Sequence, residues 1–248
     1  MTTAHLFSDK SDIYAKNRPL YPQAFFDWIK SHLNGTDLAW DCATGSGQAA
    51  LGLADIFKQV EATDISENQL AQAFPVPNIR YTVSSAEKTA FNDHCFDMVN
   101  VAQALHWFDI PAFFGEVRRV LKPSGLFTVS CYSAHQVTPE IDQVVTRTVS
   151  DIIYPYWAAN NQLCWNGYAA IDFPFTPLTT PRFAMTAQWD LNRLFGYIHS
   201  WSATRRCMEE IGESFFDDAY ARVRNIWGDP KQTYTVTFPM TVIAGHVE

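Results

Sequence analysis

Glycines and carboxylates mark the ends of two short apolar segments in the first third of the chain. The first segment carries Asp41 and runs into a turn that contains Gly45 and Gly47, followed by a stretch rich in Ala and Leu. Glycines at a strand-to-helix turn let the backbone approach a ligand and point N–H groups at it. Asp64 ends the next apolar segment, nineteen residues after Gly45. A carboxylate there can accept hydrogen bonds from both hydroxyls of a ribose, so the pattern predicts a ribose-containing cofactor beside Asp64 and Ile65.

Two classes of cofactor fit this glycine turn. The letters Gly45-Ser-Gly-Gln-Ala-Ala50 match the G-x-G-x-x-A fingerprint of dinucleotide binding, so an NAD(P)-dependent oxidoreductase is one interpretation. Asp41 argues against it, because a carboxylate just ahead of the turn would repel a diphosphate. The sulfonium and α-ammonium groups of S-adenosylmethionine (SAM) are cations that a carboxylate attracts. We therefore predict SAM as the cofactor and keep NAD(P) as the alternative.

Polar and aromatic side chains follow the third and the fourth apolar segment. Residues 84–87 come directly after the third, where a side chain can reach an adenine edge, and the fourth leads into the stretch 102–108. Ligands of open α/β sheets bind at the carboxyl ends of the strands. We expect further cofactor contacts from these two stretches, at Ser85, Ala86, Glu87, Gln103, Ala104 and Trp107.

The elements that must position these residues alternate between strands and helices. Apolar runs predict strands at 38–42, 60–63, 79–83, 96–101 and 126–132. Helical periodicity and capping residues predict helices at 22–33, 48–57, from Ser66 onward and at 109–121. Strands that are mostly apolar are typical of a parallel sheet with helices on both faces, so the sequence predicts an α/β fold.

The composition changes in the second half of the chain. Residues 154–181 combine aromatic side chains with prolines and asparagines, which is typical of an irregular insertion. The pattern predicts helices at 139–153, 190–203 and about 213–227, and two final strands at 234–238 and 241–247 around Pro239-Met240.

Composition excludes several classes of protein. The 248 residues carry 18 basic and 26 acidic side chains, a net charge of −8 that repels a phosphate backbone, so we do not expect a nucleic-acid partner. The five cysteines form no C-x-x-C pair, which favours reduced thiols in a cytoplasmic protein. Neither a signal peptide nor a run of eighteen apolar residues is present, so we do not expect a membrane partner.

Together these motifs resemble the class I SAM-dependent methyltransferases, and within them the trans-aconitate methyltransferase family, over nearly the whole chain. Besides the glycine turn and its two acids, the segments similar to family signatures are 14–22, 85–87, 104–107, 119–125 and 200–203. The resemblance implies a Rossmann-like fold that binds SAM and releases S-adenosylhomocysteine (SAH). It also implies that Tyr14 and Arg18 fold over the methionine end of the cofactor.

The resemblance also predicts the organisation of the chain. We expect one methyltransferase domain over residues 1–248, with a mostly parallel seven-stranded sheet, helices on both faces, a C-terminal strand pair and an aromatic-rich helical cap. Its parts are an N-terminal lid and helix at 1–35, a cofactor-binding core at 36–150, a cap at 151–232 and terminal strands at 233–248.

One residue of the turn departs from the commonest family pattern, which has glycine at position 43. Here the residue is Ala43. Its methyl group restricts the backbone, and we expect this cofactor-contacting alanine to keep a negative φ.

The acceptor of the methyl group is a small molecule whose identity the sequence does not name. A carboxylate acceptor is already ionised at neutral pH, whereas a hydroxyl must lose a proton, for which His106 is the candidate base. We expect substrate contacts from His106, Trp107, Trp201 and Arg205, with no metal. The resemblance favours a small acid; a non-catalytic relative that only binds the cofactor is a further alternative.

Overall fold

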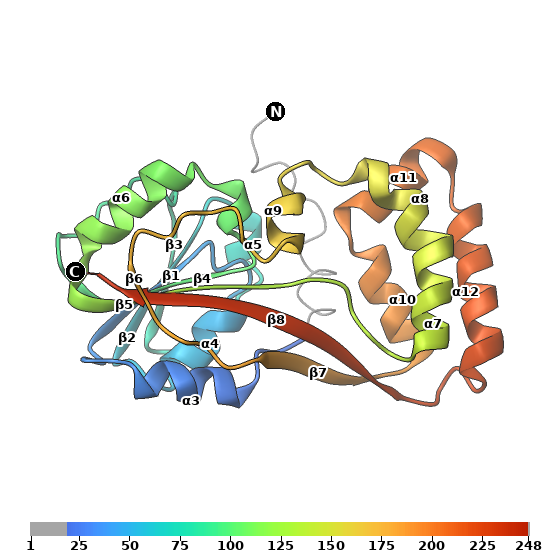
Figure 1. Ribbon diagram of the computed structural model, residues 1–248, viewed down its shortest axis with the longest axis horizontal. Coiled ribbons are helices and arrows are strands. Elements are labelled where there is room, and N and C mark those ends of the chain that lie inside the picture. The colour runs from blue at the N-terminus through green and yellow to red at the C-terminus, as the bar shows by residue number, and fades with distance from the viewer. Residues whose placement is uncertain (1–18, 248) are drawn as a thin grey trace.

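The structure, a computed structural model, describes residues 19–247. It forms two lobes, a core in which helices flank a sheet and a helical cap at the far end of two long strands (Figure 1). No helix among the described residues is both long enough and apolar enough to span a bilayer.

The sheet has eight strands, one more than the seven expected. Its order is β3-β2-β1-β4-β5-β8-β6, with β7 also pairing with β8. The strands are β1 (Leu38–Cys42), β2 (Gln59–Asp64), β3 (Ile79–Val83), β4 (Phe96–Ala102), β5 (Leu121–Tyr132), β6 (Thr176–Pro177), β7 (Phe183–Trp189) and β8 (Tyr234–His246). Strands β1 to β5 are parallel, as predicted, and β6, β7 and β8 are antiparallel to their neighbours. From β1 the chain runs outward through β2 to β3 and then crosses to β4 on the other side of β1, so the carboxyl ends of β1 and β4 frame a ligand crevice.

Helices pack on both faces of the parallel strands. The core helices are α3 (Gln23–Ser31), α4 (Gln48–Ala54), α5 (Glu67–Leu70), the short 3-10 helix η1 (Leu105–Trp107) and α6 (Ile110–Val120). Capping residues fix where two of them begin: the Ser66 side chain accepts from the backbone N–H of Gln69, and Asp109 accepts from that of Ala112. The Rossmann-like fold that the sequence predicted is thereby confirmed.

The cap consists of helices at the far end of β7 and β8 (Figure 1). They are α7 (Pro139–Val145), the π-helix η2 (Thr146–Ser150), α8 (Asp151–Ile153), the 3-10 helix η3 (Tyr154–Tyr156), α10 (Leu191–His199), α11 (Ser202–Ile211) and α12 (Ser214–Trp227). The short helix α9 (Asn161–Trp165) lies between the two lobes and contacts η1 and β5 of the core. The single helix expected at 190–203 is two helices, because the backbone of Trp201 is extended, with φ −67° and ψ 137°.

The C-terminal strand pair is one continuous strand, β8. Its first half pairs with β7 from Tyr234 to Met240 and its second half with β5 from Met240 to His246. Pro239 and Met240, which we expected to separate two strands, lie where the partner changes. Strand β7 was not predicted, because its residues follow directly on the aromatic-rich insertion.

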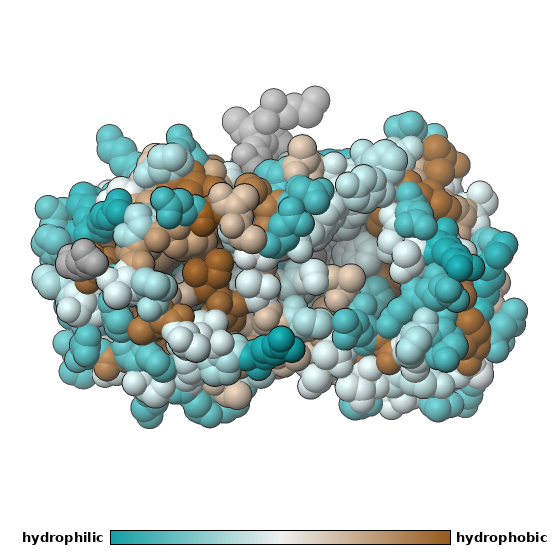
Figure 2. Space-filling model, in the orientation of Figure 1, coloured by the Kyte–Doolittle hydropathy of each residue, from teal (hydrophilic) through white to brown (hydrophobic). Residues whose placement is uncertain are grey.

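Hydrophobic packing ties the aromatic insertion to the core. Phe173 and Phe175 pack against Phe114 of α6 and Phe127 of β5 in tilted and edge-to-face arrangements, with ring centroids 4.8–6.4 Å apart. On the face shown in Figure 2, apolar side chains gather over the middle of the core lobe, whereas hydrophilic ones predominate on the outer helices of the cap. The segment that precedes β6 is thus a packed excursion over the core.

Candidate functional site

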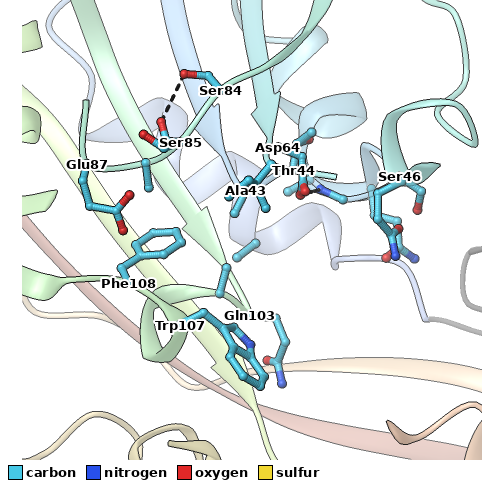
Figure 3. Close-up of a pocket in the computed structure, with 18 of the residues that line it drawn as sticks. Ala43, Thr44, Ser46, Asp64, Ser84, Ser85, Glu87, Gln103, Trp107 and Phe108 are labelled. Carbon is cyan, nitrogen blue, oxygen red and sulfur yellow. Dashed lines mark hydrogen bonds between the residues drawn. The ribbon is translucent and has the colours of Figure 1, made fainter. Parts of the chain in front are cut away.

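A cavity of about 290 Å³ lies at the carboxyl ends of the parallel strands. Residues that follow β1, β2, β3 and β4 line it, together with Tyr132 at the end of β5 (Figure 3). The predicted cofactor residues that line the cavity are Ala43, Gly45, Asp64, Ile65, Ser85, Ala86, Glu87, Gln103, Ala104 and Trp107. Tyr14 and Arg18 lie outside the described residues.

The glycine turn has three residues in the left-handed region of φ. They are Gly45 at +58°, Gly47 at +84° and, against expectation, Ala43 at +54°. The expectation of a negative φ at Ala43 is therefore wrong. The turn bends the chain back over β2, where the backbone N–H of Thr44 donates to the Thr63 carbonyl at 2.8 Å. This hydrogen bond holds Ala43 in the left-handed conformation, which glycine adopts without strain.

We predict that Ala43→Gly stabilises the protein. A non-glycine residue in the left-handed region costs about 1–2 kcal/mol, part of which the greater freedom of glycine in the unfolded chain offsets. The expected gain is up to about 1 kcal/mol, a rise of about 2–4 °C in the thermal midpoint. Ala112→Gly, in the right-handed helix α6, is the control and should lower the midpoint. Equal decreases in the thermal midpoint of both variants would contradict a strained backbone at Ala43.

Asp64 joins the glycine turn to the helix that follows β2. One carboxylate oxygen accepts from the Gly45 N–H at 2.9 Å and the other from the Ser66 N–H at 2.8 Å. Burial raises the pKa of this carboxyl, and the backbone donors oppose that rise. Each oxygen keeps a further lone pair for a ligand in the cavity.

Asp41 lies beneath the turn and does not line the cavity. It is 1% exposed, and its oxygens accept from the Thr44 hydroxyl at 2.5 Å and the Asn100 amide at 2.7 Å. Burial raises the pKa of Asp41 to about 6, although these donors lower it. Asp41 therefore acts on the cavity through Thr44, which lines it, and through its charge.

Gly47 also stands behind the cavity wall. It caps α4, and a β-carbon added to it would lie 2.5 Å from the hydroxyl oxygen of Tyr81. Glycine is thus required by the close approach of the Tyr81 ring as well as by the positive φ.

The segment after β3 forms the opposite wall of the cavity. The Glu87 carboxylate points toward the ring of Phe108 (Figure 3) and accepts from the backbone N–H of Asp109 at 3.2 Å. The hydroxyl of Ser84 donates to the Ser85 carbonyl at 3.1 Å. Phe108 and Ile65 line the cavity together with this wall.

Gln103 shapes the end of the cavity nearest the cap. It has a φ of +60°, and its side chain clamps the backbone of Tyr132, donating to the carbonyl at 3.1 Å and accepting from the N–H at 2.8 Å. Trp107 lies beside it in the cavity wall (Figure 3). This end is therefore lined by neutral and aromatic groups among the described residues.

Three predicted substrate residues do not reach this cavity. His106 is buried, its Nδ1 lies 3.0 Å from the Tyr168 hydroxyl, and burial lowers its pKa to about 4. Trp201 packs against aromatic rings of the cap, and Arg205 donates to the Ser200 carbonyl at 3.1 Å. Of the two neighbours in the short helix η1, Trp107 lines the cavity and His106 does not.

Several residues that line the cavity were not predicted from the sequence. They are Tyr21, Thr44, Ser46, Gln48, Ala49, Gln69, Ser84, Ala102, Phe108 and Tyr132. The carboxyl-end rule could have found Tyr132, since it ends the fifth predicted strand. Within residues 19–247 no group of three or more His, Cys, Asp or Glu side chains is arranged to hold a metal ion.

Comparisons with known proteins agree with this geometry. A family model of a methyltransferase domain matches residues 40–129. A Dictyostelium discoideum protein named as a methyltransferase is 32% identical over 203 residues, which cover 79% of this chain and 76% of the relative. The solved structure of a protein from Anaeromyxobacter dehalogenans, described as a type II methyltransferase, has a TM-score of 0.86 and 35% identity over 92% of this chain and 97% of that one. The YcgJ protein of Bacillus subtilis, 17% identical with a TM-score of 0.52 over 91% and 98% of the two chains, shares the fold.

Proposed function

Since the chain belongs to the class I SAM-dependent methyltransferases, we propose that the cavity at the carboxyl ends of β1 to β5 binds SAM and directs its methyl group toward the cap. The observation that carries this proposal is Asp64. Its carboxylate lines the cavity and at the same time fixes the Gly45 N–H of the turn.

The cavity wall offers complementary groups along its length. Asp64 would accept hydrogen bonds from the ribose hydroxyls, and Ser85, Ala86 and Glu87 would contact the adenine. The turn from Ala43 to Ser46 would hold the methionine end, and Asp41 below it supplies a negative charge that attracts a cationic ligand. Gln103, Ala104 and Trp107 would then surround the methyl end. We expect Tyr14 and Arg18 to close over it.

Methyl transfer requires mainly that the protein align the acceptor with the methyl group. SAM, when bound, supplies an electrophilic methyl group on a sulfonium. Holding an acceptor in line with that group can contribute roughly 7–11 kcal/mol through orientation. The clamp of Gln103 on Tyr132 makes this end of the cavity rigid, and the ring of Trp107 can attract a cation on its face.

We propose a small carboxylic acid as the acceptor, as the resemblance to the trans-aconitate methyltransferase family implies. Its carboxylate is the nucleophile at neutral pH, so O-methylation requires no general base. This proposal suits a site in which His106 is held against Tyr168 with a pKa of about 4. An arginine of the cap, Arg205, is the candidate that orients the acid.

The test combines binding with turnover. Calorimetry should show binding of SAM and SAH but not of NAD, and a screen of dicarboxylic and tricarboxylic acids should yield a methyl ester identified by mass spectrometry. Binding of NAD alone would overturn the proposal that SAM is the cofactor. The proposal of a carboxylic acid acceptor would be overturned if the protein binds SAM and methylates hydroxyls or amines but no acid.

A further inference from the structure

A buried chain of hydrogen bonds crosses three strands beneath the glycine turn. The Thr128 hydroxyl on β5 donates to the Asn100 side-chain oxygen on β4 at 2.8 Å, and the Asn100 amide donates to Asp41 on β1 at 2.7 Å. Thr44 donates to the other Asp41 oxygen. Asn100, Thr128 and Asp41 are each at most 1% exposed. We call this chain of hydrogen bonds the strand relay, and its only member that lines the cavity is Thr44.

All the donors of the strand relay point toward Asp41. Thr128 satisfies the Asn100 oxygen and polarises the amide, which strengthens the amide's own bond to the carboxylate. If the amide turned over, its oxygen would face the carboxylate and repel it. Thr128 thus acts on Asp41 from two strands away without touching it.

The charge on Asp41 depends on these neutral donors. The groups that face it are Asp64 on β2, whose charge disfavours ionisation, and Tyr81 on β3 and Cys42 on β1, whose own ionisation the Asp41 charge disfavours. Stabilisation comes from Asn100, from Thr44 and from the backbone N–H of Ala50. No described cation contributes to it. Loss of one donor should therefore favour the protonated form.

We propose that Asn100 and Thr128 are positioning residues for the cofactor: they keep Asp41 ionised and thereby hold the Thr44 hydroxyl and its turn in the binding geometry. The expected effect on SAM binding rests on the proposed function. The expected effect on the ionisation of Asp41 rests on the strand relay alone. Without the relay, Asp41 keeps a proton at higher pH, the Thr44 hydroxyl loses its ionised acceptor, and the charge beneath the cationic ligand disappears.

The chain offers a matched set of variants on one strand. Thr128→Val removes the hydroxyl and keeps the shape, whereas Thr128→Ser keeps the hydroxyl. Ser130→Ala is the control: its side chain lies two residues along the same face of β5, is fully buried, and its hydroxyl has no hydrogen-bond partner among the described residues. A merely structural effect of losing a buried hydroxyl from β5 would appear in Ser130→Ala as well.

Two readouts separate the inference from the proposed function. The first is the carboxyl ¹³C titration of Asp41 in the ligand-free protein, assigned with Asp41→Asn. We expect Thr128→Val to move the titration midpoint upward by about one pH unit, and Thr128→Ser and Ser130→Ala to leave it near the wild-type value. The second is SAH affinity measured from pH 5.5 to 8.5, where the loss of affinity at low pH should begin about one pH unit higher in Thr128→Val, a difference of about threefold at a pH midway between the two midpoints.

An unchanged Asp41 titration in Thr128→Val would overturn the inference, whatever the protein binds. The inference also fails if Ser130→Ala matches Thr128→Val in both readouts. If the titration shifts while the wild-type protein binds neither SAM nor SAH, the proposed function fails and the link from Thr128 to Asp41 stands.

Discussion

Replacing Asp64 with Asn should weaken SAH binding at least about 100-fold. The carboxylate accepts from the N–H groups of Gly45 and Ser66 and, on the proposed function, from two ribose hydroxyls. An amide keeps only one acceptor oxygen and turns its NH₂ toward one of the backbone donors. Losing two hydrogen bonds to a charged group, at about 1.5–3 kcal/mol each, corresponds to two orders of magnitude or more.

The control for Asp64→Asn is Asp37→Asn. Asp37 lies at the opposite end of β1, is exposed and pairs with Lys58 at 2.7 Å. Calorimetric titration of both variants with SAH should show a loss in Asp64→Asn only. Affinity within threefold of wild type in Asp64→Asn would place the ribose elsewhere and would remove the main support for the proposed site.

Replacing Asp41 with Asn should make the ligand-free protein more stable and SAM binding weaker. The pKa of Asp41 is about 6 in the folded protein against an ordinary value of 3.8, so ionising this buried group near neutral pH opposes folding by about 3 kcal/mol at most. An asparagine fits the same contacts: its oxygen accepts from Asn100, and its NH₂ can donate to the Thr44 hydroxyl. Loss of the charge beneath a cationic cofactor should lower SAM affinity about tenfold.

The pH dependence gives Asp41→Asn a direct test. Because the folded-state pKa is raised, the contribution of Asp41 to the free energy of unfolding is full below about pH 4 and is lost as the pH rises through about 6. Urea unfolding should therefore show the variant more stable than wild type at pH 8, with a smaller difference at pH 4.5. A variant less stable than wild type at pH 8 would contradict this account.

The strands of the core could be predicted closely from the sequence, and the physical reason is burial. The strand β1 has the bounds that its apolar run predicted, because a strand covered by helices on both sides requires a continuous apolar segment. The edge strand β3 has the bounds that its alternating apolar and polar residues predicted. The elements of the second half follow less directly from the pattern of residues. Proline suggested a break within β8, but at Pro239 the strand only changes partners.

The part of the site that lies at the ends of the strands could be predicted from the sequence. The carboxyl ends of the strands indicated Asp64, Glu87 and Gln103, and all three line the cavity, since strand ends fix where a residue lies. Side-chain direction after a turn was not predictable: His106 and Trp107 are neighbours in the short helix η1, and of the two Trp107 lines the cavity. The strand relay was missed because a single Asn or Thr within an apolar strand gives no sign of its partner.

The long strand β8 has a consequence for how the chain is made. Its 13 residues join the core to the cap, and they lie at 234–246, after every other described element. During synthesis the parallel strands and the cap helices leave the ribosome before the segment that connects them by pairing. The nascent chain must therefore keep the open edges of β5 and β7 from associating with other chains until β8 emerges. Pairing over so long a separation in sequence is intrinsically slow, so the two lobes should join only some time after β8 has emerged.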